Sequence, residues 1–207
     1  MSSKIRILLA DDHMLMRMGL SALIVTAQDM EIVGEARNGR QAVEFACSLR
    51  PDLIIMDLVM PELSGSEATR LIHEACPEIK IVILTTFGTS AELARAVTSG
   101  AVGVLLKDTA DMDLLNAIRF IAAGNQIIPT RLLRQIEQDN ALSQLSTRQL
   151  EILSAVARGL SNSDIARNFS LSEVTIKKHL SAIFAKLNVA NRTEATALAL
   201  RKQLVKT

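Results

Sequence analysis

The chain has 207 residues, a formal net charge of +1, and 49% hydrophobic but only 2% aromatic residues, so aliphatic side chains must pack its core. This length fits a domain of about 120 residues followed by a smaller one. No run of 18 apolar residues and no signal-peptide pattern occurs, so we expect no membrane span and a cytoplasmic location. Cys47 and Cys76 lack the spacing of a zinc site, and we expect them in helices as small apolar residues or near-surface thiols.

The near-neutral total hides two parts of opposite charge. Residues 1–144 contain 13 lysines and arginines against 18 aspartates and glutamates, a net charge of −5. Residues 145–207 contain 10 against 4, a net charge of +6. This asymmetry indicates that the first part handles a cation and the second a polyanion.

Strand and helix patterns alternate five times in the first part. Apolar runs predict strands at 4–10, 31–36, 53–56, 79–85 and 102–106. Helical spacing predicts helices near 13–27, 40–49, 65–75, 90–99 and 111–123, with Asp12 as the cap of the first. This alternation without long loops is typical of an α/β doubly wound five-stranded parallel sheet. Core packing is the favoured interpretation of Met14, Met16 and Met18, and an exposed surface for self-association is the alternative.

The second part is all-helical. Residues 125–144 are polar and interrupted, and we interpret them as a linker that holds a short helix near 130–138. Beyond it, helices are predicted from the Ser146 cap to Gly159, and then at 162–168, 173–187 and 192–204. The predicted organisation is a domain over 1–124, a linker over 125–144, and a small four-helix domain over 145–207.

Polar side chains follow four of the predicted strands. Asp11 and Asp12 follow the first strand, Asp57 the third, Thr85 ends the fourth and Lys107 follows the fifth. The carboxyl ends of parallel strands meet at one edge of a sheet, so these groups should converge. Three carboxylates in one place repel each other and need a cation, and oxygen-only ligands suit Mg²⁺. An aspartate beside Mg²⁺, a lysine and a hydroxyl indicates a phosphoryl-accepting site.

The first part resembles the receiver domain of two-component response regulators, which has a flavodoxin-like fold. The matching residues are Asp11-Asp12, Asp57 with Met60-Pro61 and Ser64-Gly65, Thr85-Thr86, and Lys107-Asp108. The resemblance implies that Asp57 accepts a phosphoryl group from a sensor histidine kinase and that Lys107 pairs with the phosphoryl oxygens. It implies that Thr85 turns its hydroxyl toward the phosphate and draws the 85–90 loop inward. The implied Mg²⁺ ligands are Asp11, Asp12, Asp57 and the backbone carbonyl of Val59.

One departure from the receiver pattern concerns the switch residue. Val104 stands where receivers usually carry an aromatic side chain, so rotation of an aromatic ring cannot be the readout here. A competing class is the haloacid-dehalogenase type of phosphatase, which needs a second aspartate two residues after the nucleophile, where this chain has Val59. We expect no enzymatic activity beyond self-phosphorylation and autodephosphorylation. A binding module that works without phosphorylation is the third alternative.

The second part resembles a LuxR-type helix-turn-helix, which together with the receiver indicates the NarL/FixJ group. The matching residues are Leu145-Ser146-Thr147-Arg148, Leu153, Gly159, Asn162, Ile165-Ala166, Leu171-Ser172, Val174, Thr175-Ile176-Lys177, His179, Leu187 and Arg192-Thr193. The resemblance implies a phosphorylation-dependent transcription factor that binds double-stranded promoter DNA as a homodimer. The kinase, the operator and the sign of regulation are not encoded in recognisable form.

Helix 173–187 would be the recognition helix in the major groove. At helical spacing, the residues expected to face the core are Val174, Ile176, Leu180 and Ile183. The residues expected to face DNA are Lys177, Lys178 and Ser181, with the two lysines as base-edge contacts. The phosphate-contact candidates are Thr175, His179, Lys186, Arg192 and Thr193. Helix 192–204 is one candidate dimer surface, and helices 13–27 and 111–123 are the other.

Overall fold

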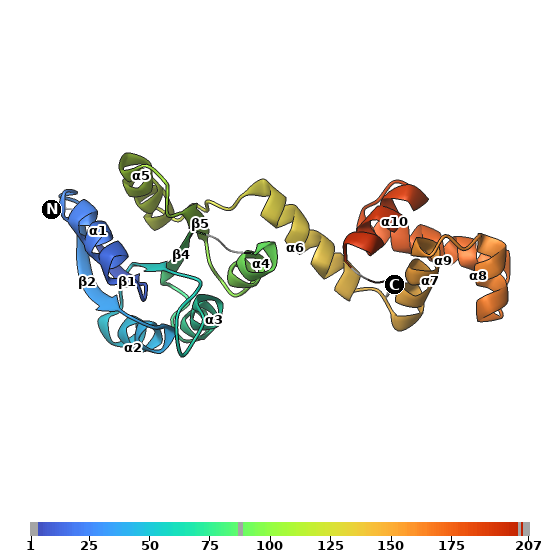
Figure 1. The fold of residues 1–207 in the computed structure, drawn as a ribbon, viewed down its shortest axis with the longest axis horizontal. Helices are drawn as coiled ribbons and strands as arrows, with labels where there is room; N and C mark the ends of the chain where they lie inside the picture. Colours follow the sequence, from blue (N-terminus) through green and yellow to red (C-terminus); the bar gives the residue numbers. More distant parts are fainter. Residues whose placement is uncertain (1–3, 87–88, 203, 205–207) are drawn as a thin grey trace. The chain divides into compact units, whose positions relative to one another are not determined.

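The structure is a computed structural model that describes residues 4–86, 89–202 and 204 (Figure 1). The chain forms two compact units, Met1–Leu133 and Arg134–Thr207. Their boundary falls inside the segment predicted as a linker. Ile127 forms a β-bridge with Gly103, while Leu142 packs in the helical core, so this segment divides between the two units.

The first unit is built on a parallel sheet. The strands are β1 (Ile5–Ala10), β2 (Met30–Ala36), β3 (Leu53–Met56), β4 (Lys80–Thr85) and β5 (Gly103–Leu106). Among the described residues they form one five-stranded sheet in the order β2-β1-β3-β4-β5, with every pair parallel. The order reverses at β1, which lies between β2 and β3 and so places a ligand crevice at its carboxyl end. The predicted α/β doubly wound class is confirmed.

Helices cover both faces of this sheet. They are α1 (Met14–Val25), α2 (Gly39–Leu49), α3 (Gly65–Ala75), α4 (Ser90–Thr98) and α5 (Asp111–Ala122). Side chains of a strand point alternately to its two faces. Ile7 and Leu9 of β1 therefore pack with α1 and α5 in one core on the first face, whereas Leu8 is buried on the opposite face. On that other face α3 contacts both α2 and α4 (Figure 1).

Two expectations about α1 are wrong. The residue that precedes the helix is His13, so Asp12 lies one position too early to act as its cap. Met14 and Met18 are 62% and 58% exposed, so core packing is wrong for both, whereas Met16 does pack against the core. The buried side of α1 instead carries Leu20 and Ile24, and Met14 and Met18 lie on the solvent-exposed side.

The start of α3 is pressed against the loop that follows β3. Ser64 caps this helix and forms a capping box with Glu67, and the Gly65 N–H donates to the Leu58 carbonyl at 2.9 Å. A Cβ on Gly65 would lie 1.9 Å from the Asp57 carbonyl oxygen. Only glycine permits this approach, so the backbone around Asp57 is held by a helix that begins eight residues later.

The second unit is all-helical, as predicted. The helices after the sheet are α6 (Thr130–Ser143), α7 (Thr147–Ala157), α8 (Asn162–Phe169), α9 (Glu173–Leu187) and α10 (Arg192–Arg201). Ser146 and Ser172 cap α7 and α9 as expected, because each hydroxyl accepts from a backbone N–H of the first turn. α6 is longer than the short helix expected at 130–138. The core is aliphatic, with Ile152, Ile176 and Leu198 fully or almost fully buried.

Candidate functional site

Three of the predicted site residues meet at the carboxyl edge of the sheet. The Lys107 Nζ lies 2.6 Å from Asp11 Oδ2 and 2.8 Å from Asp57 Oδ2. All three side chains are at most 7% exposed. The convergence follows from the strand order, because β1 and β3 are neighbours and the Asp57 N–H donates to the Ala10 carbonyl at 2.8 Å.

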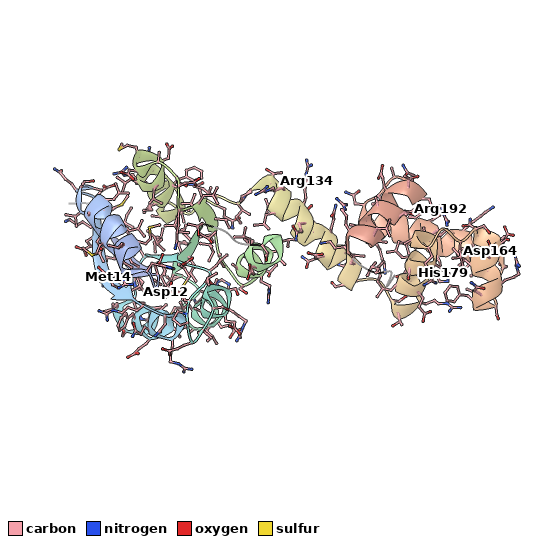
Figure 2. All side chains as sticks on the ribbon, viewed as in Figure 1. Asp12, Met14, Arg134, Asp164, His179 and Arg192 are labelled. Atoms are coloured by element: carbon pink, nitrogen blue, oxygen red, sulfur yellow. The ribbon has the colours of Figure 1, made fainter. Side chains whose placement is uncertain are left out.

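Asp12 and one residue that sequence reasoning missed complete an acidic pocket. The His13 Nδ1 lies 2.9 Å from Asp12 Oδ1 and 3.3 Å from Asp11 Oδ1. Asp11, Asp12, His13 and Asp57 each offer a ligand atom, and these atoms lie within 4.8 Å of one another. Asp12 is exposed beside the start of α1 (Figure 2), so it opens the pocket to solvent. The only sequence signal for His13 was its position directly after the two aspartates.

The electrostatics of this pocket favour added positive charge. Burial raises the pKa of Asp57, and the Asp11 carboxylate adds to the rise while Lys107 opposes it. Burial alone would lower the pKa of Lys107, but its hydrogen bonds to Asp11 and Asp57 raise it above the ordinary value. Both groups therefore hold their protons more tightly than in water. Carboxylate oxygens in such a pocket fit a hard divalent cation, and the donor set agrees with Mg²⁺.

Neighbouring groups fix the orientation of the reactive carboxylate. The Leu58 N–H donates to Asp57 Oδ1 at 2.8 Å, which leaves Oδ2 to Lys107. The Arg17 side chain, only 5% exposed, donates from Nη1 to the Asp11 carbonyl at 2.7 Å and lies 3.3 Å from Glu35. Arg17 was not predicted, because a cation at this place in a helix reads as a surface residue until its burial is known.

The remaining predicted receiver residues lie around the pocket. Thr85 is buried at the end of β4, and its carbonyl accepts from the Lys107 N–H at 3.0 Å. Val104 is buried in β5 opposite Ile83. Val59 follows two residues after Asp57, and its carbonyl as a ligand stays a prediction. The predicted movement of the 85–90 loop involves positions 87 and 88, which lie outside the described residues.

The helical unit presents one polar stripe on α9. Lys177, Lys178 and Ser181 are exposed, as expected for a surface that meets DNA. The expectation that Val174 faces the core is wrong, because it is 63% exposed. Val174 precedes the buried Ile176 by two positions, or about 200° around the helix, so it shares the face of Lys177 and Lys178 instead.

The phosphate-contact candidates divide into two groups. Thr193 is exposed, and Thr175 and His179 are half-buried, so all three have side chains that reach the surface. The Lys186 Nζ already donates to the Gln144 carbonyl at 3.1 Å and to Gln149 Oε1 at 3.0 Å. Arg192, at the start of α10 (Figure 2), donates to the Leu160 carbonyl and to Asn162 Oδ1. Their phosphate contacts stay predictions, and these bonds give both residues a structural role within the unit.

Comparison with protein families agrees with both halves of this description. The model of the family described as "Response regulator receiver domain" matches residues 7–119. That of the family described as "Bacterial regulatory proteins, luxR family" matches residues 143–199. The chain belongs to the two-component response regulators with a LuxR-type DNA-binding domain. It is thus a helix-turn-helix transcription regulator with a receiver domain.

Full-length relatives share the arrangement of this response regulator. It is 40% identical to the uncharacterised transcriptional regulatory protein YxjL of Bacillus subtilis, over 98% of each chain. It is 37% identical to the response regulator protein VraR of Staphylococcus epidermidis, over 97% of this chain and 99% of that protein. A crystal structure of the response regulator ChrA from a heme-sensing two-component system is 33% identical, with a TM-score of 0.55, over 99% of this chain and all of that one.

No helix in the described part of the response regulator is both long and apolar enough to cross a bilayer.

We expect Asp57→Asn to raise the melting temperature at pH 7 in the presence of a chelator, by about 2–4 °C. Because the pKa of Asp57 is raised in the folded state, its stabilising contribution is present below the unfolded-state pKa of about 4 and is lost as the pH rises through the folded-state value. At pH 7 the ionised carboxylate therefore lowers stability, and the amide does not.

Thermal melts of wild type and Asp57→Asn from pH 7 downward measure this difference. The advantage of the variant should shrink as the pH approaches the unfolded-state pKa. Added Mg²⁺ should raise the melting temperature of wild type more than that of the variant. Glu31→Gln, at an exposed position of β2, is the charge-matched control and should change little. A variant that melts below wild type at pH 7 with chelator would contradict the argument.

Proposed function

We propose that this response regulator accepts a phosphoryl group on Asp57 from a sensor histidine kinase, and that phosphorylation controls its dimerisation and its binding to promoter DNA. The observation that supports this most strongly is the Asp57 carboxylate. It is buried at a strand end, oriented by the Leu58 N–H at 2.8 Å, and paired with Lys107 at 2.8 Å inside a pocket of three aspartates. We expect the protein in the cytoplasm, because its DNA partner is there.

The chemistry begins with attack of an Asp57 carboxylate oxygen on the phosphorus of a phosphohistidine. The N–P bond breaks, the electron pair stays on the kinase imidazole, and Asp57 becomes an acyl phosphate. Lys107 exchanges its contact with the carboxylate for one with a phosphoryl oxygen, and Thr85 supplies a hydroxyl to another. Asp11, Asp12, Asp57 and the Val59 carbonyl would hold Mg²⁺, which would supply charge neutralisation for the transferring group when bound.

The same pocket limits the reaction to self-phosphorylation and slow hydrolysis by water. A phosphatase of the haloacid-dehalogenase type uses an aspartate two residues after the nucleophile as general acid and base. In this chain that residue is Val59, whose side chain is exposed and carries no proton to transfer. The pocket therefore stores a phosphoryl group instead of turning over an external substrate.

We expect Asp57→Asn to lose phosphoryl incorporation from acetyl phosphate to background. The amide is not a nucleophile. Among the described residues, the only other carboxylate within hydrogen-bond reach of Lys107 is that of Asp11, and Arg17 fixes the Asp11 backbone by donating to its carbonyl. Intact mass and peptide mapping measure the incorporation, with and without Mg²⁺.

Asp52→Asn is the matched control, because Asp52 is exposed at the opposite end of β3 and should leave incorporation unchanged. Asp12→Ala should remove both incorporation and its dependence on Mg²⁺. Undiminished labelling of Asp57→Asn would show that the acceptor is another residue.

DNA binding is assigned to the exposed face of α9. This face joins two lysines and a serine to the apolar Val174, and the residues from 145 onward carry a net charge of +6. Lysine can donate to guanine O6 and N7, and a valine methyl can contact a thymine methyl. Buried Ile176, Leu180 and Ile183 on the opposite face fix the helix in the bundle, so the face with the lysines can lie in the major groove.

We expect Lys177→Ala and Lys178→Ala each to weaken cognate binding by about 1–3 kcal/mol and to relax base preference. The loss of affinity for random DNA should be smaller, because each variant removes only one positive charge that attracts the DNA phosphates. Fluorescence anisotropy on cognate and scrambled duplexes at several salt concentrations measures both effects.

Arg201→Ala, at an exposed position of α10, changes the net charge equally and serves as the control. If it lost as much cognate affinity as the lysine variants, or if these lost the same on both duplexes, the assignment of base contacts would be wrong.

The dimer is assigned to the face formed by α1 and α5. It exposes the apolar side chains Met14, Leu15 and Met18 of α1 together with Met112 and Phe120 of α5. A groove of about 430 Å³ runs between the two helices, lined by Leu20, Leu23 and Leu114 among others. α10 is less suited, because Ala195, Leu198 and Ala199 are buried in its own bundle and only Leu200 is a large exposed apolar residue there.

We expect Met18→Glu and Met112→Glu to raise the dissociation constant of the phosphorylated dimer about tenfold or more, equivalent to about 1.4 kcal/mol. A carboxylate on this face would have to be buried without a partner. Sedimentation of the acetyl-phosphate-treated protein measures assembly. Leu200→Glu tests α10 and should leave the dimer intact. Loss of assembly in Leu200→Glu alone would move the interface to α10.

A further inference from the structure

The two cysteines of this chain lie against each other, away from the acidic pocket. Cys47 lies in α2, and Cys76 follows the last residue of α3, so the expectation that both lie in helices is wrong for Cys76. Their Sγ atoms are 3.9 Å apart. The two helices pack side by side on the sheet, so this distance is set by secondary structure and not by a loose loop. The positions are 29 residues apart in sequence, and the composition alone gave no reason to pair them.

The two thiols differ in access to solvent. Cys47 is exposed, whereas Cys76 is only 3% exposed. Burial raises the pKa of Cys76, and the adjacent Cys47 thiol adds to the rise, so Cys76 stays protonated and protected. Arg50 and Glu78, an ion pair at 3.3 Å, follow the two cysteines closely in sequence and place charges near them. A second thiol next to an accessible one is placed to condense with a sulfenic acid formed on the accessible sulfur.

We propose that Cys47 and Cys76 form a modification site that a hydroperoxide oxidises to a reversible intramolecular disulfide. The Cys47 thiol loses its proton to solvent, and the thiolate attacks one oxygen of hydrogen peroxide. The O–O bond breaks, Cys47 becomes a sulfenic acid, and the departing hydroxide takes up a proton and leaves as water. The Cys76 sulfur then attacks the sulfenic sulfur and gives up its proton, the S–O bond breaks, and the departing hydroxide takes up that proton and leaves as a second water. Two thiols are oxidised by two electrons, and the peroxide is reduced to two molecules of water.

The geometry permits this bond with a small rearrangement. A disulfide is about 2.05 Å long, so the sulfur atoms must approach by about 2 Å. Cys76 follows the last residue of α3 with φ −142°, outside the helical region, and Cys47 lies in the last turn of α2. Both can therefore shift without breaking the middle of a helix.

The bond would close a loop that contains β3, Asp57 and α3. It leaves the pocket residues themselves untouched, since the sulfur atoms belong to α2 and to the far end of α3. Cross-linking restricts the unfolded chain, so the oxidised protein should be the more stable form. The site would preserve Cys47 from irreversible oxidation, because Cys76 traps the sulfenic acid first.

The test treats the full-length protein with hydrogen peroxide in the absence of a phosphoryl donor. We expect the free thiols to fall from two per chain to none, with a linked Cys47–Cys76 peptide in the non-reducing digest. Dithiothreitol should restore both thiols, and the oxidised protein should melt several degrees higher. The same result is expected in the Asp57→Asn background, so failure here is distinguishable from failure of the phosphorylation proposal.

Two variants separate the roles of the cysteines. Cys47→Ser, at the exposed position, should keep the Cys76 thiol reduced under the same peroxide treatment. Cys76→Ala should end with Cys47 as sulfinic or sulfonic acid, and if this variant does not fold, the wild-type peptide map decides alone. Retained thiols, a sulfinic acid at Cys47 beside an intact Cys76 thiol, or cross-linking between chains in wild type would each overturn the proposal.

Discussion

The repulsion among three aspartates at one sheet edge is the constraint on which the receiver half depends. Burial removes Asp11 and Asp57 from water, and the single positive charge of Lys107 is shared between these two carboxylates, at 2.6 and 2.8 Å. The pocket is therefore less stable than an apolar one would be, and it is prepared to gain stability from a cation or from the loss of a charge. Phosphorylation acts on the same balance, because it places a group rich in negative charge where Lys107 can leave a carboxylate for a phosphoryl oxygen.

The surrounding fold holds this unfavourable arrangement in place. Gly65 lets the first turn of α3 approach the backbone of Asp57, and buried Arg17 anchors the Asp11 carbonyl. The Leu58 N–H orients the reactive carboxylate. None of these residues touches a substrate, yet each helps to hold Asp11 or Asp57 in position at the carboxyl edge of the sheet. The free energy gained by packing elsewhere in the sheet offsets this local electrostatic cost.

The helical half has no comparable electrostatic cost among its described residues, because its charged groups stay in contact with water. Its core is aliphatic. The cationic side chains that are candidates for DNA contact differ in whether they already donate hydrogen bonds within their own unit. Lys177 and Lys178 lie free on one face of α9, whereas Lys186 and Arg192 donate to backbone carbonyls of their own unit. An arginine or lysine bonded in this way stabilises the bundle even where it also lies close to a phosphate. The contact between Cys47 and Cys76 likewise became apparent only in the structure. The helices α1 and α5, in contrast, were already a candidate dimer surface in the sequence.

The sequence by itself determined whatever depends on local order. Strand runs followed by Asp11, Asp57 and Lys107 predicted the sheet edge. Helical spacing predicted α3 and α9 to the residue, with Ser172 as the cap of α9. These features follow from chain connectivity and from period, which a sequence contains. Only the tertiary structure decided which distant groups meet: His13 over the aspartates, buried Arg17, Val174 on the open side of α9, and Cys47 beside Cys76. Such contacts depend on how separate elements pack, and no local pattern encodes the angle or the face at which two helices meet.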